Sequence, residues 1–308
     1  MQHKELLTSS LQAYQLYRSK LHTRCPVCNS TSISELPDYQ RAFLSKCNEC
    51  HFIFSKVIPS EEELETFYSN EYQLTEFFSP ITAKRYEDIL DGFEYLKKTN
   101  NLLDIGVGSA FFAEIAIKHG WNVYGTELTD QTIQKAEEKG VKMSKGQLET
   151  MNFEPDFFDL VVGIEVIEHV SFPKTFVQEI GKSLRSGGAV YITTPNFNSL
   201  LRRQLKSKYD VISYPNHLSY FTSKSLKALF EANGFSKASL VTYGISRTRV
   251  KTSTGKSNQA FVSETSDDEI LRHRIEKRWY LRTLKYGVNG FLNLFRLGDS
   301  IKATFIKR

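Results

Sequence analysis

The chain has 308 residues, of which 40% are hydrophobic and 24% charged, and its formal net charge is +5 at pH 7. This length can bury one large core beside a small appendage, and the composition excludes a disordered or collagen-like chain. No apolar run approaches the roughly 20 residues of a membrane-spanning helix, and the first residues lack the apolar core of a signal peptide. We therefore expect a cytoplasmic protein without a transmembrane segment.

Two helical segments are predicted on either side of a cysteine-rich module. Residues 1–22 form a mixed polar helix, in which apolar side chains recur near one face. Residues 59–98 form a helical lid or linker, which begins with the capping-box residues Ser60 and Glu63 and continues in a second helix over 82–98.

All four cysteines lie in two Cys-x-x-Cys turns within residues 23–58: Cys25, Cys28, Cys47 and Cys50. This spacing is typical of a structural zinc site, because each turn can give two thiolates to one ion. The segment between the turns is short and polar, so metal binding would supply folding energy. Without a secretion signal, a closed four-sulfur site is favoured over two disulfides. The pattern resembles a zinc ribbon.

Residues 99–308 alternate between short apolar strands and amphipathic helices. Strands alternating with helices predict an α/β fold with a doubly wound, mostly parallel sheet and helices on both faces. One more helix is expected from Thr222 to Gly234, and the Ser-, Thr- and Lys-rich segment 251–268 is predicted as a mobile surface loop. The predicted strands are 101–105, 121–126, 141–144, 158–164, 189–194, 235–243 and 298–306, and the predicted helices between the first strands are 109–119, 130–139 and one that Pro173 begins.

A glycine-rich turn follows the strand at 101–105, in the segment Asp104-Ile-Gly-Val-Gly-Ser-Ala110. Glycine lets the backbone approach a ligand closely, and the helix that follows exposes unpaired N–H groups. Glu127 ends the next apolar run, about 20 residues on, where a carboxylate can bind a ribose diol. The sequence therefore predicts a pocket for a nucleoside-containing cofactor. Phe111 stands where a nicotinamide fingerprint requires a third glycine.

These blocks and their order resemble class I S-adenosylmethionine-dependent methyltransferases over roughly residues 85–245 and the C-terminal strand. Further matches are Lys145–Glu149, Phe158–Val170 and Ser186–Pro195. The resemblance implies a seven-stranded sheet whose last strand is antiparallel, with S-adenosylmethionine as the cofactor. The cofactor-binding residues that it implies are Asp104, Gly106, Gly108, Glu127, Leu128, Gln147, Leu148 and Glu165.

His217 is the predicted general base, with Tyr214 beside it, because a neutral imidazole near pH 7 can take a proton from the acceptor. The segment Tyr214-Pro-Asn-His-Leu-Ser-Tyr-Phe221 resembles one in sugar C-methyltransferases, where the matching His and Tyr lie at the acceptor. In that family a Glu precedes the His, whereas this chain has Asn216, so O-methylation fits at least as well. The alternative is that His217 caps or packs the helix that begins near Thr222.

The Glu165-x-x-Glu168-His169 run has two interpretations. It resembles a run that is linked to a divalent metal in ubiquinone-pathway O-methyltransferases, and in most methyltransferases it lines the cofactor site instead.

Substrate contacts are predicted from both ends of the chain. Tyr68 and Tyr72 either close over the acceptor or pack as helix-face aromatics. Arg202 and Arg203, with nearby lysines, either bind phosphates of the acceptor or form a solvated helix face. Residues 251–308 hold 12 Lys and Arg against 6 Asp and Glu, which favours a phosphate-bearing partner or, again, a solvated basic helix.

We expect an enzyme that methylates a small acceptor, a carbohydrate or phosphate-bearing metabolite such as a nucleotide-sugar or glycan, with structural Zn²⁺. The alternatives are a zinc-ribbon RNA base methyltransferase and an inactive methyltransferase-like interaction module. A mild net charge and few basic residues interleaved with aromatics in the ribbon speak against nucleic acid. The acceptor atom and the oligomeric state stay open.

Overall fold

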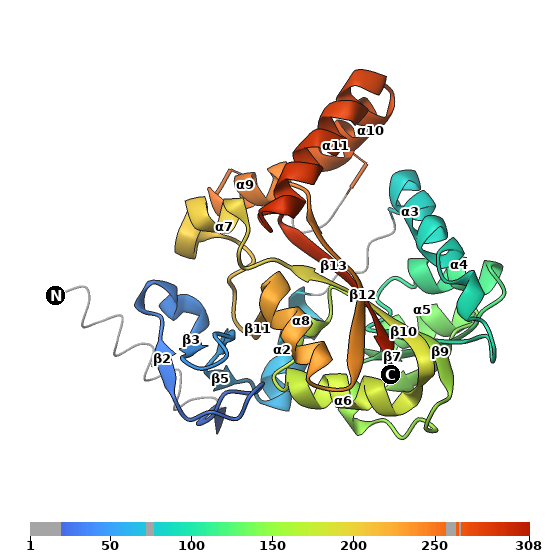
Figure 1. Ribbon diagram of the computed structural model, residues 1–308, viewed down its shortest axis with the longest axis horizontal. Helices are drawn as coiled ribbons and strands as arrows, with labels where there is room; N and C mark the ends of the chain where they lie inside the picture. Colours follow the sequence, from blue (N-terminus) through green and yellow to red (C-terminus); the bar gives the residue numbers. More distant parts are fainter. Residues whose placement is uncertain (1–19, 72–76, 257–262, 265) are drawn as a thin grey trace.

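The computed structural model of the chain describes residues 20–71, 77–256, 263–264 and 266–308, drawn in Figure 1. The helix predicted over residues 1–22 lies outside these residues, except that Lys20–Leu21 form a strand, β1. Within these ranges, no helix combines the length and the apolar character that crossing a bilayer requires.

A seven-stranded sheet forms the centre of the molecule, as predicted. Its strand order is β12-β13-β10-β9-β6-β7-β8. The pairs from β10 to β8 are parallel, and β13 lies antiparallel between β10 and β12. The strands are β6 (Asn101–Ile105), β7 (Asn122–Glu127), β8 (Lys142–Lys145), β9 (Phe158–Ile164), β10 (Leu184–Pro195), β12 (Phe235–Tyr243) and β13 (Ser300–Lys307).

Helices cover both faces of this sheet because side chains alternate along its strands. Leu102 packs with residues of α3 (Pro80–Asp91), α4 (Phe111–Lys118) and α5 (Asp130–Glu138). Its neighbour Leu103 packs on the other face with α6 (Pro173–Ser183) and α8 (Ser223–Glu231). The doubly wound arrangement is therefore confirmed.

Local capping explains where several helices begin. The Ser79 hydroxyl accepts a hydrogen bond from Thr82 N at the start of α3, and Pro173 occupies the first turn of α6. Thr222 and Ser225 form a reciprocal capping box at the start of α8. The cap of this helix is thus Thr222, and the alternative in which His217 caps it is wrong.

The zinc ribbon shares a sheet with the segment that follows His217. Strands β2 (Ile33–Glu35), β3 (Leu44–Cys47) and β4 (Ile53–Ser55) continue into β11 (Ser219–Tyr220), with the order β11-β4-β3-β2. A second pair joins β1 to β5 (Val57–Ile58). Phe52 stacks on Phe54 and packs on Phe221, so the ribbon shares the main core.

The remaining helices differ from prediction in extent or were not predicted. The helix expected over 82–98 ends at Asp91, next to Gly92. The loop expected over 251–268 is shorter than predicted, because helix α9 (Arg247–Ser253) extends into its beginning and α10 starts at Asp267. For residues 251–308 the sequence suggested only a solvated basic helix without bounds, and the structure has two helices there, α10 (Asp267–Glu276) and α11 (Trp279–Leu294), which project from the sheet in Figure 1. The lid helix α2 (Glu61–Glu71) and the short α7 (Leu200–Leu205) complete the fold.

Candidate active site and zinc centre

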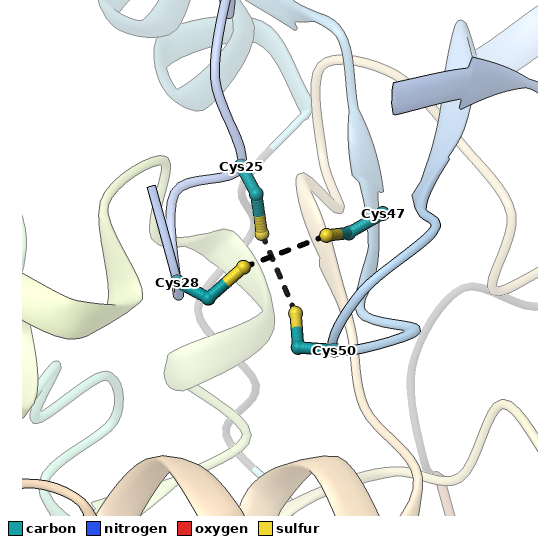
Figure 2. A group of neighbouring side chains, drawn as sticks. All are labelled: Cys25, Cys28, Cys47 and Cys50. Atoms are coloured by element: carbon teal, nitrogen blue, oxygen red, sulfur yellow. Dashed lines mark hydrogen bonds between the residues drawn. The ribbon is translucent and has the colours of Figure 1, made fainter. Parts of the chain in front are cut away.

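The four cysteine sulfurs converge on one point, as Figure 2 shows. The Sγ atoms of Cys25 and Cys50 are 3.6 Å apart, and those of Cys28 and Cys47 are 3.5 Å apart. Zinc–thiolate bonds of about 2.3 Å in a tetrahedron place sulfurs about 3.8 Å apart, whereas a disulfide bond is about 2.05 Å. The donor set therefore fits a structural zinc ion, and the disulfide alternative does not fit.

The two turns around the cysteines have the same backbone design. Asn29 N donates to Cys25 O at 2.9 Å, and His51 N donates to Cys47 O at 3.1 Å. Asn29 and His51 both have positive φ, 62° and 60°. This left-handed residue after each pair turns the chain so that both thiols of a pair face the same ion.

A cavity of about 180 Å³ opens at the carboxyl ends of the central strands, where open α/β sheets bind ligands. Gly106 forms part of its wall, with φ +66°, and a Cβ there would lie 2.9 Å from Val166 Cγ2. Only glycine allows the turn to pass Val166 at this distance. Gly108 continues the turn with φ +55°.

Glu127, at the end of β7, closes one side of the cavity. Its carboxylate accepts hydrogen bonds from Leu128 N at 2.8 Å and from Gly108 N at 3.3 Å, which fixes it against the glycine turn. Burial raises the pKa of Glu127. Asp104 is buried behind the turn, and burial, followed by the nearby Glu127, raises its pKa to about 8. Asp104 is not among the residues that line the cavity.

The loop after β8 forms the opposite wall. Gly146 N donates to Glu127 O at 2.9 Å, which links this loop to β7. Gln147 precedes a short 3-10 turn, and the buried Leu148 contributes apolar surface to the cavity. A carboxylate beside a glycine turn on one side and apolar surface on the other fits the ribose and the base of an adenosine. The residues present thus fit S-adenosylmethionine.

The lid helix α2 covers this cavity from the amino-terminal side. Leu64 and Tyr68 both line it. Tyr72, the second predicted lid tyrosine, lies outside the described residues. Tyr214 donates its hydroxyl to Glu63 Oε2 of the same helix at 3.0 Å. The structure therefore joins Tyr214 to the lid helix, and Tyr214 is not among the cavity-lining residues.

Glu165 stands at the end of β9, where the cavity meets a cationic region. It has a positive φ of 55°, a conformation that is uncommon for a residue other than glycine. Its Oε1 accepts the Thr193 hydroxyl at 2.9 Å, and its Oε2 lies 3.9 Å from Arg249. Thr193 is the direct partner of Lys302 across β10 and β13. Glu165 therefore separates the cofactor cavity from these cations.

His217 packs behind His169, with ring centroids 4.9 Å apart. His169 lines the cavity and donates Nδ1–H to Asn216 O at 2.6 Å. His217 donates Nδ1–H to Val211 O at 2.5 Å, so its Nε2 carries the free lone pair. Burial, followed by His169, lowers the pKa of His217 to about 3, so the ring is neutral near pH 7.

Glu168, rather than Glu165, lies with the two imidazoles. One donor atom from each of Glu168, His169 and His217 lies within 4.8 Å of the others. Both carboxylate oxygens of Glu168 are buried without a hydrogen-bond partner among the described residues. Burial, followed by Glu165, raises the pKa of Glu168 well above its ordinary value. The predicted metal set of Glu165, Glu168 and His169 is therefore not the set that the structure brings together.

Arg202 and Arg203 lie away from the cavity. Arg202 donates to Phe197 O at 2.5 Å and to the Tyr39 hydroxyl at 3.3 Å, so it joins α7 to the ribbon. Arg203 is exposed and donates to Asn198 Oδ1 at 2.7 Å. Neither is among the residues that line the cavity.

The cations that do approach Glu165 were missed in the sequence. Lys302 lies over the Tyr243 ring at 4.1 Å. Its pKa falls to about 8, first because of burial and then because of Arg85, Lys285 and Arg272. Among the described residues, Lys302 forms neither an ion pair nor a hydrogen bond through its ammonium group. The sequence places Lys302 between the apolar residues Ile301 and Ala303 of a predicted strand. A lysine in this position could have indicated a partly buried cation.

A family model described as a methyltransferase domain matches residues 78–240. The chain is 29% identical over 127 residues to a ubiquinone biosynthesis O-methyltransferase of Idiomarina loihiensis, which covers 39% of this chain and 51% of the relative. It is 28% identical over 137 residues to the enzyme of that name from Nitrosomonas europaea, covering 42% and 57%. The chain thus spans about half the length of these curated relatives.

A SAM-dependent methyltransferase structure from Archaeoglobus fulgidus aligns with a TM-score of 0.51 at 15% identity, covering 79% of this chain and 99% of that one. This likeness shows the fold, which is that of class I S-adenosylmethionine-dependent methyltransferases. The chain belongs to the methyltransferase-domain family.

Proposed function

We propose that this protein transfers a methyl group from S-adenosylmethionine to a small, phosphate-bearing acceptor. The observation that supports this most directly is the position of Glu165, with the cofactor cavity on one side and cations on the other. A cation that is partly buried and lacks an anionic partner favours an anionic ligand.

The residues that would hold the cofactor are those of the cavity wall. Glu127 would bind the ribose hydroxyls, and the loop of Gln147 and Leu148 would border the adenine. The turn at Gly106 and Gly108 would approach the methionine part. When bound, S-adenosylmethionine supplies an electrophilic methyl group on a sulfonium.

Lys302 and Arg249 would orient the acceptor through its phosphate, beside Glu165. His217 is our candidate for the base, because it is neutral near pH 7 and its Nε2 is free to accept a proton. His169 lies between His217 and the cavity and would position it. Methylation at oxygen is favoured, since Asn216 cannot exchange a proton and the curated relatives are named O-methyltransferases.

The experiment uses the purified chain, methyl-labelled cofactor and a cell extract. Three portions of the extract are compared: untreated, treated with phosphatase, and treated with nuclease. We expect a small labelled product that survives nuclease and is lost after phosphatase. A labelled product that only nuclease removes would assign the protein to RNA methylation. Cofactor binding by calorimetry without any labelled product would indicate an interaction module.

Matched variants test the acceptor contact. Lys302→Met should reduce labelled product at limiting extract at least tenfold, because it removes a charge-assisted contact of about 1.5–3 kcal/mol. Arg203→Gln is the control, since Arg203 is exposed and bonds only Asn198 among the contacts described. Equal losses in both variants would contradict the assignment of Lys302.

A further inference from the structure

Helix α11 presents its apolar side to solvent and its polar side to the protein. Asn289 Oδ1 accepts from Gly244 N at 2.9 Å, and Asn293 Oδ1 accepts from Thr242 N at 3.0 Å. Leu292, between them, is 2% exposed. These contacts fix the inward face of the helix against the end of β12.

The opposite side of α11 carries a continuous apolar stripe. Residues at spacings of four, eight, eleven and fifteen share one side of a helix. The stripe residues are exposed as follows: Tyr280 48%, Leu284 61%, Val288 41%, Phe291 57% and Phe295 53%. Trp279, at 73%, and Leu294, at 74%, lie along one flank of it near the two ends of the helix. A contiguous exposed patch of this kind marks an interaction surface rather than scattered surface residues.

The charged residues of the helix itself have one sign. Residues 277–296 contain five cations and no Asp or Glu: Lys277, Arg278, Arg282, Lys285 and Arg296. Apart from Lys285, which pairs with Glu276 at 2.6 Å, none of these five forms an ion pair among the described residues. Arg278 lies against the stripe, because it donates to the Tyr280 hydroxyl at 2.7 Å, so two copies packed side by side at this end would bring like charges together. A surface of anionic headgroups would complement them.

We propose that α11 lies on the surface of an anionic membrane, with its apolar stripe in the headgroup region and its cations against the lipid phosphates. An amphipathic helix with aromatic residues on one side and Lys and Arg on its polar side is the form that binds at such interfaces. The helix has 16 residues, so its axis is about 24 Å long. Figure 1 shows it projecting from the sheet beside α10. This proposal does not depend on the acceptor that the enzyme uses.

The test is flotation of the whole protein with vesicles of phosphatidylcholine, with and without phosphatidylglycerol. The wild type should float with the mixed vesicles and lose binding as salt is added. Arg278→Gln with Arg282→Gln should weaken binding roughly 25-fold, at about fivefold per cation. Leu284→Glu and Phe291→Glu should abolish it. Tyr95→Glu is the matched control, because Tyr95 is a 74% exposed aromatic on another element.

Tryptophan fluorescence gives a second readout. Trp121 is 3% exposed and Trp279 is 73% exposed, so a blue shift on adding vesicles reports Trp279. Absence of flotation and of the shift would overturn the proposal, as would equal binding by wild type and Leu284→Glu. A dimer in sedimentation that Leu284→Glu dissociates, without vesicle binding, would also overturn it and assign the stripe to a second copy.

Discussion

Ser55 of the ribbon donates its backbone N–H to the carbonyl of Leu218 at 2.8 Å. Leu218 directly follows the proposed base, and its own N–H donates to Glu168 O at 2.8 Å. The segment that carries His217 is therefore bonded to the zinc ribbon on one side and to the 3-10 turn after β9 (Ile167–His169) on the other. The ribbon is therefore bonded to the segment that carries the proposed base and is not a separate appendage.

Removing zinc should weaken the hydrogen bond from Ser55 to Leu218, on the ribbon side of this segment, more than the bond from Leu218 to Glu168 on the other side. Chelation leaves four thiols without the ion that holds them together. Hydrogen bonding to Cys25, followed by burial, raises the pKa of Cys50, so this thiol takes up a proton. Hydrogen exchange should become faster at Ser55 N by at least tenfold, while Leu218 N, bonded to Glu168, should change less. Equal protection at Ser55 with and without zinc would contradict this coupling.

His217→Gln should lower turnover about 100-fold, since general-base catalysis contributes roughly that much. Cofactor affinity by calorimetry should stay nearly the same, because His217 is not among the cavity-lining residues. The pKa of His217, about 3, predicts no inflection near pH 6.5 in the turnover profile. His169→Gln is the comparison. Loss of turnover in His169→Gln alone would assign the role of base to His169. If added Mn²⁺ or Mg²⁺ restored the turnover of either variant, Glu168, His169 and His217 would be metal ligands instead.

Glu127→Gln should weaken binding of S-adenosylmethionine by about 10- to 100-fold, in line with the loss of a charged hydrogen-bond acceptor. The free energy of unfolding should change little or rise, because burial raises the pKa of this carboxyl. Glu138→Gln, on the exposed side of α5, is the control. Isothermal calorimetry measures the affinity of both variants for S-adenosylmethionine. Equal affinities would contradict the assignment of Glu127 to the cofactor site.

Gly106→Ala should destabilise the fold by about 2 kcal/mol and weaken cofactor binding. The new Cβ would lie 2.9 Å from Val166 Cγ2, and the residue would keep a left-handed φ that costs about 1–2 kcal/mol. Gly290→Ala, where a Cβ meets nothing within 4 Å on α11, should be neutral or stabilising. Urea denaturation and calorimetry separate the two effects. A fully stable Gly106→Ala that binds cofactor normally would show that the turn is less constrained than described.

Asp104→Asn should change how stability depends on pH. The folded-state pKa of Asp104 is about 8, above its ordinary 3.8, so the folded protein holds a proton that the unfolded chain releases. The free energy of unfolding therefore falls as pH rises from about 4 to 8, with a slope for this group of at most about 1.4 kcal/mol per pH unit. Other buried carboxyls act in the same direction, so the wild type is compared with the variant. A difference that is constant with pH would show that Asp104 ionises normally.

Patterns that are local in the sequence predicted most of the fold. Residues 235–243 form β12 as predicted, with Phe235, Leu240 and Thr242 buried. The two cysteine pairs and the glycine turn were also predicted from the sequence, since the residues that form each of them lie within a few positions of one another.

Features that depend on contacts across the chain were not predicted. Strand β11 has only two residues, and nothing in Ser219 or Tyr220 shows that they pair with Ile53 and Phe54. The outward apolar side of α11 has the same periodicity as a core helix, so the sequence does not show which way it faces. Lys302 approaches Glu165 only because β13 lies beside β10.

The place of β13 inside the sheet determines when the protein can finish folding. Ser300–Lys307 pair with β10 on one side and with β12 on the other. During synthesis, β10 and β12 are made before β13, and the edges that pair with β13 stay unpaired until residue 307 has left the ribosome. Unpaired strand edges are sites of aggregation. A chaperone that shields these edges on the nascent chain should therefore raise the soluble yield of the protein.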